Sequence, residues 1–324
     1  MIVLKNKLFK ILLAVFLLCP LSIYAYSNKV VLGGENVGIK VNSKGILVVG
    51  FYNIGNKSPG KDAGLMLGDI IIKVDDTVIS KITDLSDYSS DKESLNITYK
   101  RFNKVYTTIL KPKLDNGVYK TGLYVKNNII GIGTLTFIDP ATNRYGALGH
   151  EIVDASTGSK FEIDSGKIFN STVTDISKSE KNSVGEKNAT YDENITYGTI
   201  DKNEKTGIYG DYTSNYDKND LTDVSSSVVE GPASIVTVID GDEKLEFSIN
   251  ILSIDLNHET KNILFEVTDE RLLQKSNGIV QGMSGSPIKQ NGKLVGAVTH
   301  VMVDDPHKGY GILVTNMLKE STED

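Results

Sequence analysis

The segment Gly282-Met-Ser-Gly-Ser-Pro287 constrains the fold of this chain more than any other stretch of its sequence. Glycines lie on both sides of Ser284, and glycine reaches the positive φ angles that a tight turn requires. The proline then opens a strand, and Asn291-Gly292 is a strong hairpin signal before the returning run 294–301. We therefore expect a tight turn with an exposed serine, followed at once by antiparallel β structure.

A serine on such a turn is suited to nucleophilic chemistry. Its hydroxyl becomes a good nucleophile only when a neighbouring base accepts the proton. The turn would expose the oxygen of Ser284 and direct the backbone N–H groups of Gly282 and Ser284 at a developing oxyanion. A plain glycine-serine loop is the alternative. The order of turn, proline, strand and Asn-Gly hairpin favours catalysis, because it resembles the surroundings of the active serine in chymotrypsin-like proteases.

The base is expected among the four histidines. Chymotrypsin-like order places the histidine before the serine, and only His150 and His258 precede Ser284. His258 lies in polar, turn-like sequence, so we expect His150 to be the base, with an ordinary buried histidine as the alternative. His300 and His307 flank two aspartates in a turn-like run. No helix would hold these side chains on one face, and we expect no metal site.

The third member of a catalytic triad orients the histidine. Asp154 follows His150 closely, whereas Asp269 keeps the order histidine, aspartate, serine but lies unusually near Ser284. The spacing alone leaves the two aspartates as alternatives.

Composition and charge exclude several classes of protein. The chain has 324 residues, 40% of them hydrophobic, and a net charge of −6. This is typical of a globular protein of about two domains. The acidic balance disfavours nucleic-acid binding, which needs clustered lysine and arginine. Strand-like runs after residue 118 predict a mainly β second domain, compatible with a double β-barrel, and 269–275 is one of few helix-like segments.

The N-terminus has the pattern of an export signal. Lys5, Lys7 and Lys10 precede an apolar stretch over 11–25, which is short for a membrane span of ~20 residues. We expect residues 1–26 to be a signal peptide, or a signal anchor that holds the protein to the membrane through residues 8–25. Either alternative places the working protein outside the cytoplasm. The single cysteine, Cys19, lies inside this segment and supplies no disulfide.

Residues 27–112 resemble a bacterial PDZ domain of the kind attached to proteases. The specific part is the run SPGKDAGLMLGDIIIKV at 58–74, followed by a short helix near 82–89 and a hairpin over 95–110. The resemblance implies that the strand starting at Ile46 pairs with an extended or C-terminal peptide. Gly45 would allow close backbone approach, while Leu47 and Val49 would line the peptide pocket. Turn residues after Pro112 place the boundary there, so 113–324 would be the peptidase domain.

Three segments together resemble the SpoIVB family of sporulation serine peptidases over nearly the whole chain. They are VLGGENVGIKVNSKGILVVG, GIGTLTFIDPATNRYGALGHEIVD and SNGIVQGMSGSPIKQNGKLVGAVTHVMVDDPHKGYGI. The resemblance implies the triad His150, Asp269 and Ser284, with Asp154 kept in reserve. It also implies a fold that is mainly β, with a small PDZ domain before a chymotrypsin-like double β-barrel.

The function implied by this resemblance is signalling by proteolysis between forespore and mother cell. The peptidase would cleave itself and then the extracytoplasmic part of a membrane partner, and this cut would activate late sigma-factor processing. No cofactor is expected. The alternatives are a non-enzymatic PDZ scaffold on an inactive protease fold and a periplasm-type quality-control serine protease. The latter usually carries its PDZ domain after the peptidase rather than before it.

Overall fold

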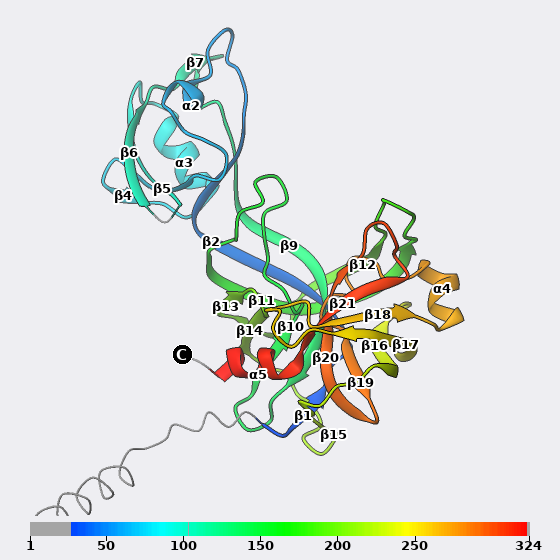
Figure 1. Cartoon of the computed structure of the whole chain (residues 1–324). Coiled ribbons are helices and arrows are strands. Elements are labelled where there is room, and N and C mark those ends of the chain that lie inside the picture. The colour runs from blue at the N-terminus through cyan, green and yellow to red at the C-terminus, as the bar shows by residue number, and fades with distance from the viewer. Residues whose placement is uncertain (1–26, 103, 323–324) are drawn as a thin grey trace, which may run out of the picture.

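The computed structural model describes residues 27–102 and 104–322, and this part of the chain is mainly β. Figure 1 shows two lobes, a small one at the upper left and a large one that contains most of the strands. The expected signal segment, residues 1–26, lies outside the described residues. Within the described ranges, no helix has the length and hydrophobicity needed to cross a membrane.

The small lobe consists of β3 to β8 with two helices, and the large lobe of β10 to β21 with β1 and the other two helices. The helices are α2 (Pro59–Asp62), α3 (Ile82–Ser89), α4 (Glu270–Ser276) and α5 (Val314–Thr322). The strands are β1 (Lys29–Leu32), β2 (Asn36–Phe51), β3 (Ile70–Val74), β4 (Thr77–Val78), β5 (Leu95–Arg101), β6 (Lys104–Leu110), β7 (Lys113–Asp115), β8 (Val118–Lys120), β9 (Leu123–Ile138), β10 (Arg144–Ala147), β11 (Ile163–Ser177), β12 (Glu186–Ile200), β13 (Lys202–Glu204), β14 (Gly207–Asp211), β15 (Leu221–Asp223), β16 (Gly231–Val238), β17 (Lys244–Ile254), β18 (Ile263–Val267), β19 (Pro287–Gln290), β20 (Lys293–Val301) and β21 (Lys308–Leu313).

Two strands of 16 residues, β2 and β9, run through both lobes and pair with each other. Their antiparallel register runs from Asn36 opposite Thr134 to Phe51 opposite Leu123. The first half of β2 also pairs with β11 in the large lobe, and its second half pairs with β3 in the small lobe. A two-stranded ribbon therefore joins the lobes, as the blue and green arrows in Figure 1 show.

The small lobe forms around its own apolar core, which includes Ile46, Ile71, Leu85 and Ile97. The short helix and the hairpin predicted for this region appear as α3 and β5–β6, and the run 58–74 forms α2 and β3. An alternating pattern of buried and exposed residues along β5 explains why it forms a strand with one face toward this core.

The second half of the large lobe is a closed barrel of the strands β16, β17, β18, β21, β20 and β19. Its interior is filled by aliphatic and aromatic residues such as Ile235, Phe247, Phe265 and Val298, none of which is measurably exposed. The predicted hairpin at Asn291-Gly292 connects β19 with β20, and both residues have positive φ.

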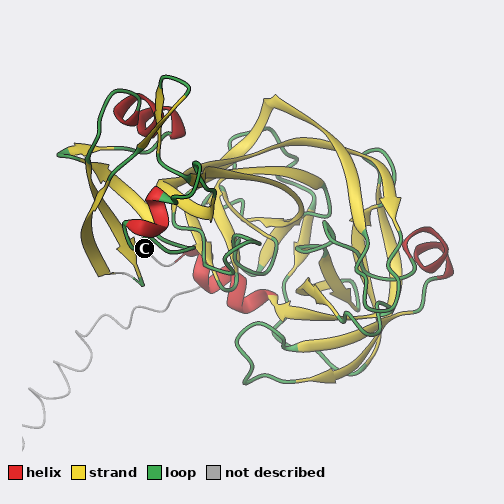
Figure 2. Ribbon diagram, turned by 90° about the horizontal axis from the view of Figure 1, so that it is seen from above, coloured by secondary structure: helices red, strands yellow, loops and turns green. Residues whose placement is uncertain are grey.

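The expected pair of barrels is only partly present. The first half of the large lobe belongs to a 13-stranded sheet ordered β13-β14-β10-β9-β2-β3-β5-β6, with β1, β4, β11, β12 and β15 attached beside it. This sheet does not close on itself, because β2 and β9 extend out of the lobe and continue its pairing into the small lobe. Figure 2, seen from above, shows the small lobe beside the strands of the large lobe.

The expected domain boundary near residue 112 stays a prediction. Strand β1 pairs with β9 and β15, and the first half of β2 pairs with β11, so these N-terminal strands lie in the large lobe. The small lobe in turn includes the start of β9, which pairs with residues 47–51 of β2.

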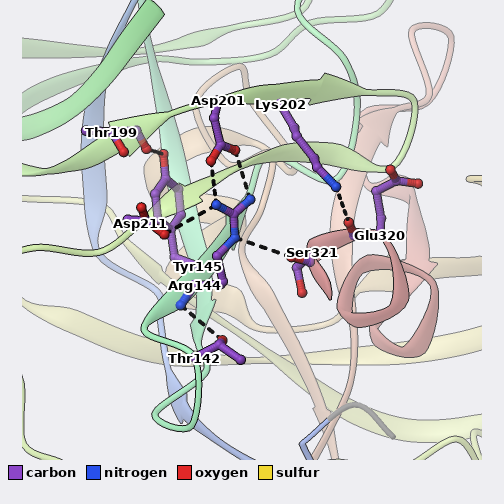
Figure 3. A network of polar contacts seen from close by, with 9 residues as sticks. All are labelled: Thr142, Arg144, Tyr145, Thr199, Asp201, Lys202, Asp211, Glu320 and Ser321. Atoms are coloured by element: carbon purple, nitrogen blue, oxygen red, sulfur yellow. Dashed lines mark hydrogen bonds and ion pairs between the residues drawn. The ribbon is translucent and has the colours of Figure 1, made fainter. Parts of the chain in front are cut away.

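The C-terminal helix α5 holds the two halves of the large lobe together. Its residues Met317 and Leu318 pack in one cluster with Phe137 and Tyr209 of the open sheet and with Ile312 of the barrel. Figure 3 shows the polar network beside this contact.

Arg144 lies at the centre of that network. Its guanidinium contacts Asp201 through two nitrogens, lies 3.3 Å from an Asp211 oxygen and donates to the carbonyl of Ser321 in α5. These carboxylates raise the pKa of Arg144, so the side chain stays charged. One cation therefore ties β10, β14 and the C-terminal helix together.

We expect Arg144→Met to lower the free energy of unfolding by about 1–2 kcal/mol, because it removes bidentate charge-assisted hydrogen bonds in a half-buried setting. Lys29→Met is a matched control, since Lys29 forms a more exposed ion pair with Asp223 at 3.4 Å. That control should change stability by less than about 0.5 kcal/mol. Urea unfolding measures both. Equal effects of the two variants would contradict the role given to Arg144.

Candidate active site

The turn that carries Ser284 has the geometry predicted from its glycines. Both Gly282 and Gly285 have φ of +93°. A Cβ on Gly285 would lie 2.0 Å from the carbonyl oxygen of Thr134, so only glycine fits there. Thr134 of β9 forms two hydrogen bonds to the turn. Its N–H donates to the Ser284 carbonyl at 2.9 Å, and its hydroxyl donates to the Gly282 carbonyl at 2.8 Å.

These bonds hold the carbonyl groups of the turn and leave two amides available. Within residues 27–102 and 104–322, neither the N–H of Gly282 nor that of Ser284 donates to a protein acceptor. The Ser284 hydroxyl donates to the carbonyl of Thr299 on β20 at 3.0 Å. The turn thus offers a hydroxyl and two backbone donors, which are the groups needed for attack on a carbonyl and for stabilising the resulting oxyanion.

Ser284 and His150 line the same cleft, which has a volume of about 770 Å³. His150 follows two residues with left-handed backbone, Leu148 (φ +67°) and Gly149 (φ +70°). A Cβ on Gly149 would lie 2.9 Å from the Thr299 methyl group, so the turn before the histidine packs closely on β20. The sequence signal of two glycines near His150 thus corresponds to a turn that presents the histidine to the serine cleft.

The protonation of His150 is set by its surroundings. Its Nδ1 lies 2.9 Å from the carbonyl oxygen of Glu151, which can only accept, so Nδ1 carries the proton and Nε2 has the lone pair. Burial lowers the pKa of His150, while the Glu151 carbonyl and carboxylate act in the opposite direction. A neutral imidazole with a free Nε2 is the form that a general base requires.

A second histidine, His300 of β20, lies beside His150, with ring centroids 5.2 Å apart. Burial, followed by the charge of His150 and of Lys261, lowers the pKa of His300 to about 4. His300 is therefore neutral near pH 7. From the sequence, His300 and His307 were not expected to form a metal site. Among the described residues, no cluster of three or more histidine, cysteine or acidic side chains is arranged to hold a metal ion.

Asp269 lies at the N-terminus of α4, and it does not line the cleft. Its carboxylate accepts hydrogen bonds from the backbone N–H groups of Ser248 and Arg271 and pairs with the Arg271 guanidinium at 2.8 Å. The Arg271 contact, helped by these backbone donors, lowers the pKa of Asp269 to about 2. The structure thus places Asp269 as the N-cap of α4, without a contact to His150.

Asp154 also lies outside the cleft lining. It is 1% exposed and accepts from Ser156 and Thr157, closing the turn that follows the His150 segment. Lys126 of β9 pairs with it at 3.3 Å. The structure therefore brings His150 and Ser284 to one cleft and leaves both candidate acids elsewhere, each in a structural contact of its own.

The expected peptide-binding strand needs a correction. Ile46 and Leu47 pair with β3 on one side, and Leu47 to Phe51 pair with the start of β9 on the other. Gly45 allows close approach as predicted, but to β3, because a Cβ there would lie 2.5 Å from the Ile71 carbonyl oxygen. Both edges are thus occupied at Leu47, whereas residues 48–51 pair with β9 alone among the described strands. For Leu47 the prediction is wrong, because strand partners are set by non-local pairing, and for the rest of the strand it stays a prediction.

Comparison with known proteins now identifies the large lobe. The family model described as SpoIVB peptidase S55 matches residues 117–318, more than half of the chain. The chain belongs to this family. No curated protein matches it.

Two solved structures are similar to parts of this S55 family member. One is the PDZ domain of the SdrC-like protein from Listeria monocytogenes, at 23% identity and a TM-score of 0.23, covering 26% of this chain and 90% of that one. The other is the active form of the Rv3671c protease from M. tuberculosis, at 15% identity and a TM-score of 0.30, covering 60% of this chain and 76% of that one.

A buried lysine that no sequence pattern predicted lies behind the serine turn of this S55 family member. Lys187 of β12 is 3% exposed, and its aliphatic stem lies 3.1–3.3 Å from the place where a Cβ on Gly282 would be. Its Nζ donates to the Thr237 hydroxyl at 3.0 Å and lies 3.5 Å from the Asn36 side-chain oxygen. Burial lowers its pKa to about 7. No sequence signal marks it, since it lies in a polar, lysine-rich stretch that reads as solvent-exposed.

The depressed pKa of Lys187 predicts a pH-dependent cost in stability. Below about pH 7 the amine is protonated in both states, and the folded state bears the full cost of a buried charge. Between about 7 and the ordinary value of 10.5 the unfolded chain holds the proton and the folded chain does not, so stability rises with pH.

We therefore expect Lys187→Met to be more stable than the parent chain at pH 6.5, by a few kcal/mol. The gap should narrow as the pH is raised toward 9.5, because the parent chain alone gains stability from this group. Urea unfolding at both pH values measures the gap. A difference between the two proteins that is constant with pH would contradict the buried, weakly basic amine.

Proposed function

We propose that this chain is a serine endopeptidase in which Ser284 is the nucleophile and His150 the general base. The observation that carries the proposal is that three kinds of group meet in one cleft. They are the Ser284 hydroxyl, two backbone N–H groups that have no acceptor among the described residues, and a histidine whose Nε2 carries the lone pair. Membership of the S55 peptidase family supports the same chemistry.

In the first step the Ser284 hydroxyl leaves the Thr299 carbonyl and bonds to the carbonyl carbon of the substrate, while its proton passes to Nε2 of His150. The substrate oxygen becomes an oxyanion that the N–H groups of Gly282 and Ser284 stabilise. The C–N bond then breaks, the His150 proton passes to the leaving amine, and an acyl-serine remains. Water, deprotonated by His150, repeats the sequence and releases Ser284.

The substrate backbone would bind as an added strand along β20. The N–H of Met302 donates to the carbonyl of Lys308, so it points toward β21. Backbone groups of successive residues in a strand point to opposite edges, so the N–H and C=O of Val301 point away from β21. That edge is the one where the Thr299 carbonyl accepts from Ser284. Strand β19 pairs with β20 only as far as Ala297, which leaves the edge near Val301 open to an extended peptide.

The small lobe would act as a PDZ domain, with its peptide site moved from β2 to β9. Residues 123–126 of β9 pair with β2 on one edge only, and no described strand pairs with the other. The Asn127 amide donates to the Ser80 carbonyl just before α3, which places this open edge near the helix. An extended peptide added here would lie along the strand that continues to Thr134 and the serine turn.

Resemblance to the SpoIVB family supports a finer function. We propose an exported signalling endopeptidase that acts between forespore and mother cell, cleaves itself, and cuts the extracytoplasmic part of a membrane partner. That cut would activate late sigma-factor processing. Residues 1–26 would direct export, and residues 8–25 would hold the protein to the membrane where the signal is not removed.

Replacing Ser284 tests the enzyme directly. We expect Ser284→Ala to abolish labelling by a fluorophosphonate probe and to lower kcat/KM on peptide substrates by about 10⁴-fold or more. Ser286→Ala is a matched control in the same turn, because the buried Ser286 hydroxyl has no partner in the described chain. It should keep both labelling and turnover. Labelling that survives in Ser284→Ala would refute the nucleophile, and an unlabelled parent chain that still binds peptides would favour a scaffold.

The role of Asp269 can be separated into capping and charge. The cap it provides fixes α4, which leads through Asn277 into the residues before the serine turn. We expect Asp269→Ala to lose activity and Asp269→Ser to keep most of it, because serine is an equally good N-cap. Asp154→Ser is the parallel variant for the reserve acid. A folded but inactive Asp269→Ser would instead assign the carboxylate to His150, as the family resemblance implies.

A further inference from the structure

Resting on the proposed function, we infer that this peptidase prefers an uncharged aliphatic side chain on the residue whose carbonyl Ser284 attacks. That residue is called the acyl residue below. The catalytic groups by themselves do not select this side chain, and the preference depends on the cleft walls beside them.

The position of the acyl residue follows from the groups that hold its carbonyl. Its oxygen must reach the N–H groups of Gly282 and Ser284, and its backbone must run along the open edge of β20 at Val301. Its side chain is therefore placed between the segment that precedes Gly282 and the end of β20. These two walls belong to one hydrogen-bonded unit, since Ile279 donates to Pro306 in the turn that follows β20.

A third wall is the turn before β12. The N–H of Asn182 donates to the Val303 carbonyl, and the N–H of Gln281 donates to the Gly185 carbonyl. Val184 lies between these two contacts and lines the cleft. The turn thus closes the space between the serine segment and the end of β20.

The side chains on these three walls are apolar or uncharged. Those that line the cleft are Val184, Ile279, Val280, Gln281, Val301 and Val303. Next to Ile279 the two walls pack backbone against backbone, because a Cβ on Gly278 would lie 2.1 Å from the carbonyl oxygen of Pro306. Among the described residues, the side chains of this pocket therefore offer aliphatic contacts and no ionised partner for a charged side chain.

Among the described residues that line the cleft, the charged side chains come from other segments than these three walls. They are Glu151, Lys205, Glu259 and Lys261, which come from the His150 segment and from the two segments beside it. Lys205 pairs with Glu259 at 2.9 Å, and Lys261 lies over the Tyr310 ring. These segments would receive the leaving-group side of the substrate, whereas the acyl residue meets the three walls described above.

The test uses the purified full chain and internally quenched peptides that differ only at the acyl residue. Peptides with valine or leucine should be cleaved with kcat/KM at least about 100-fold higher than those with lysine or aspartate, because a charge in this pocket would be unpaired. Equal or faster cleavage after lysine, still dependent on Ser284, would overturn the inference and leave the proposed function intact. The absence of any Ser284-dependent cleavage would overturn the proposed function itself.

A pair of variants assigns the preference to these three walls of the cleft. Val184→Asp should lower cleavage after valine and raise cleavage after lysine, which reverses or levels the ranking. Val153→Asp is the matched control, because Val153 lines the cleft from the His150 segment, which is not one of the three walls, and is 44% exposed. It should leave the ranking unchanged. A shift of the same size in both variants would show a general effect of charge and would contradict the assigned pocket.

Discussion

Strands β2 and β9 pair along nearly their whole length, and this pairing puts one continuous strand under both the small lobe and the catalytic turn. At its start β9 completes the small lobe beside residues 47–51, and further along Thr134 holds the carbonyls of Gly282 and Ser284. The first half of the large lobe stays open because the same two strands leave it. The orientation of the oxyanion donors therefore depends on a strand that belongs to two lobes.

Local sequence patterns predicted the elements of this fold, and non-local pairing decided how they are used. The glycines around Ser284, the Asn-Gly hairpin and the helix at 82–89 were readable because turn chemistry and periodicity act over a few residues. The strand at Ile46 was also predicted, but its two neighbours come from residues far along the chain. Local sequence patterns therefore could not predict whether an edge of this strand is free to bind a peptide.

The candidate site divides in the same way. His150 could be found from chain order and from the glycines near it, because a close turn is a local property. His300 lies beside His150, and Lys187 lies beside Gly282, through contacts between segments that are far apart in the sequence. Asp269 was predicted to be the triad acid from chain order and from the family resemblance. In the structure its carboxylate instead forms an ion pair with Arg271, two residues later.

The electrostatics of the cleft suit a transient rather than a permanent charge. When His150 accepts the serine proton, the nearest titratable ring, His300, is already neutral, because burial and the neighbouring histidine hold its pKa near 4. The two rings therefore do not compete for one proton near pH 7. The carbonyl of Glu151 accepts from Nδ1 throughout, and its carboxylate favours the imidazolium. His150 is therefore neutral in the resting state, and its surroundings stabilise it once it carries the proton. Such a base stabilises the transition state more than the ground state, which is the requirement for catalysis.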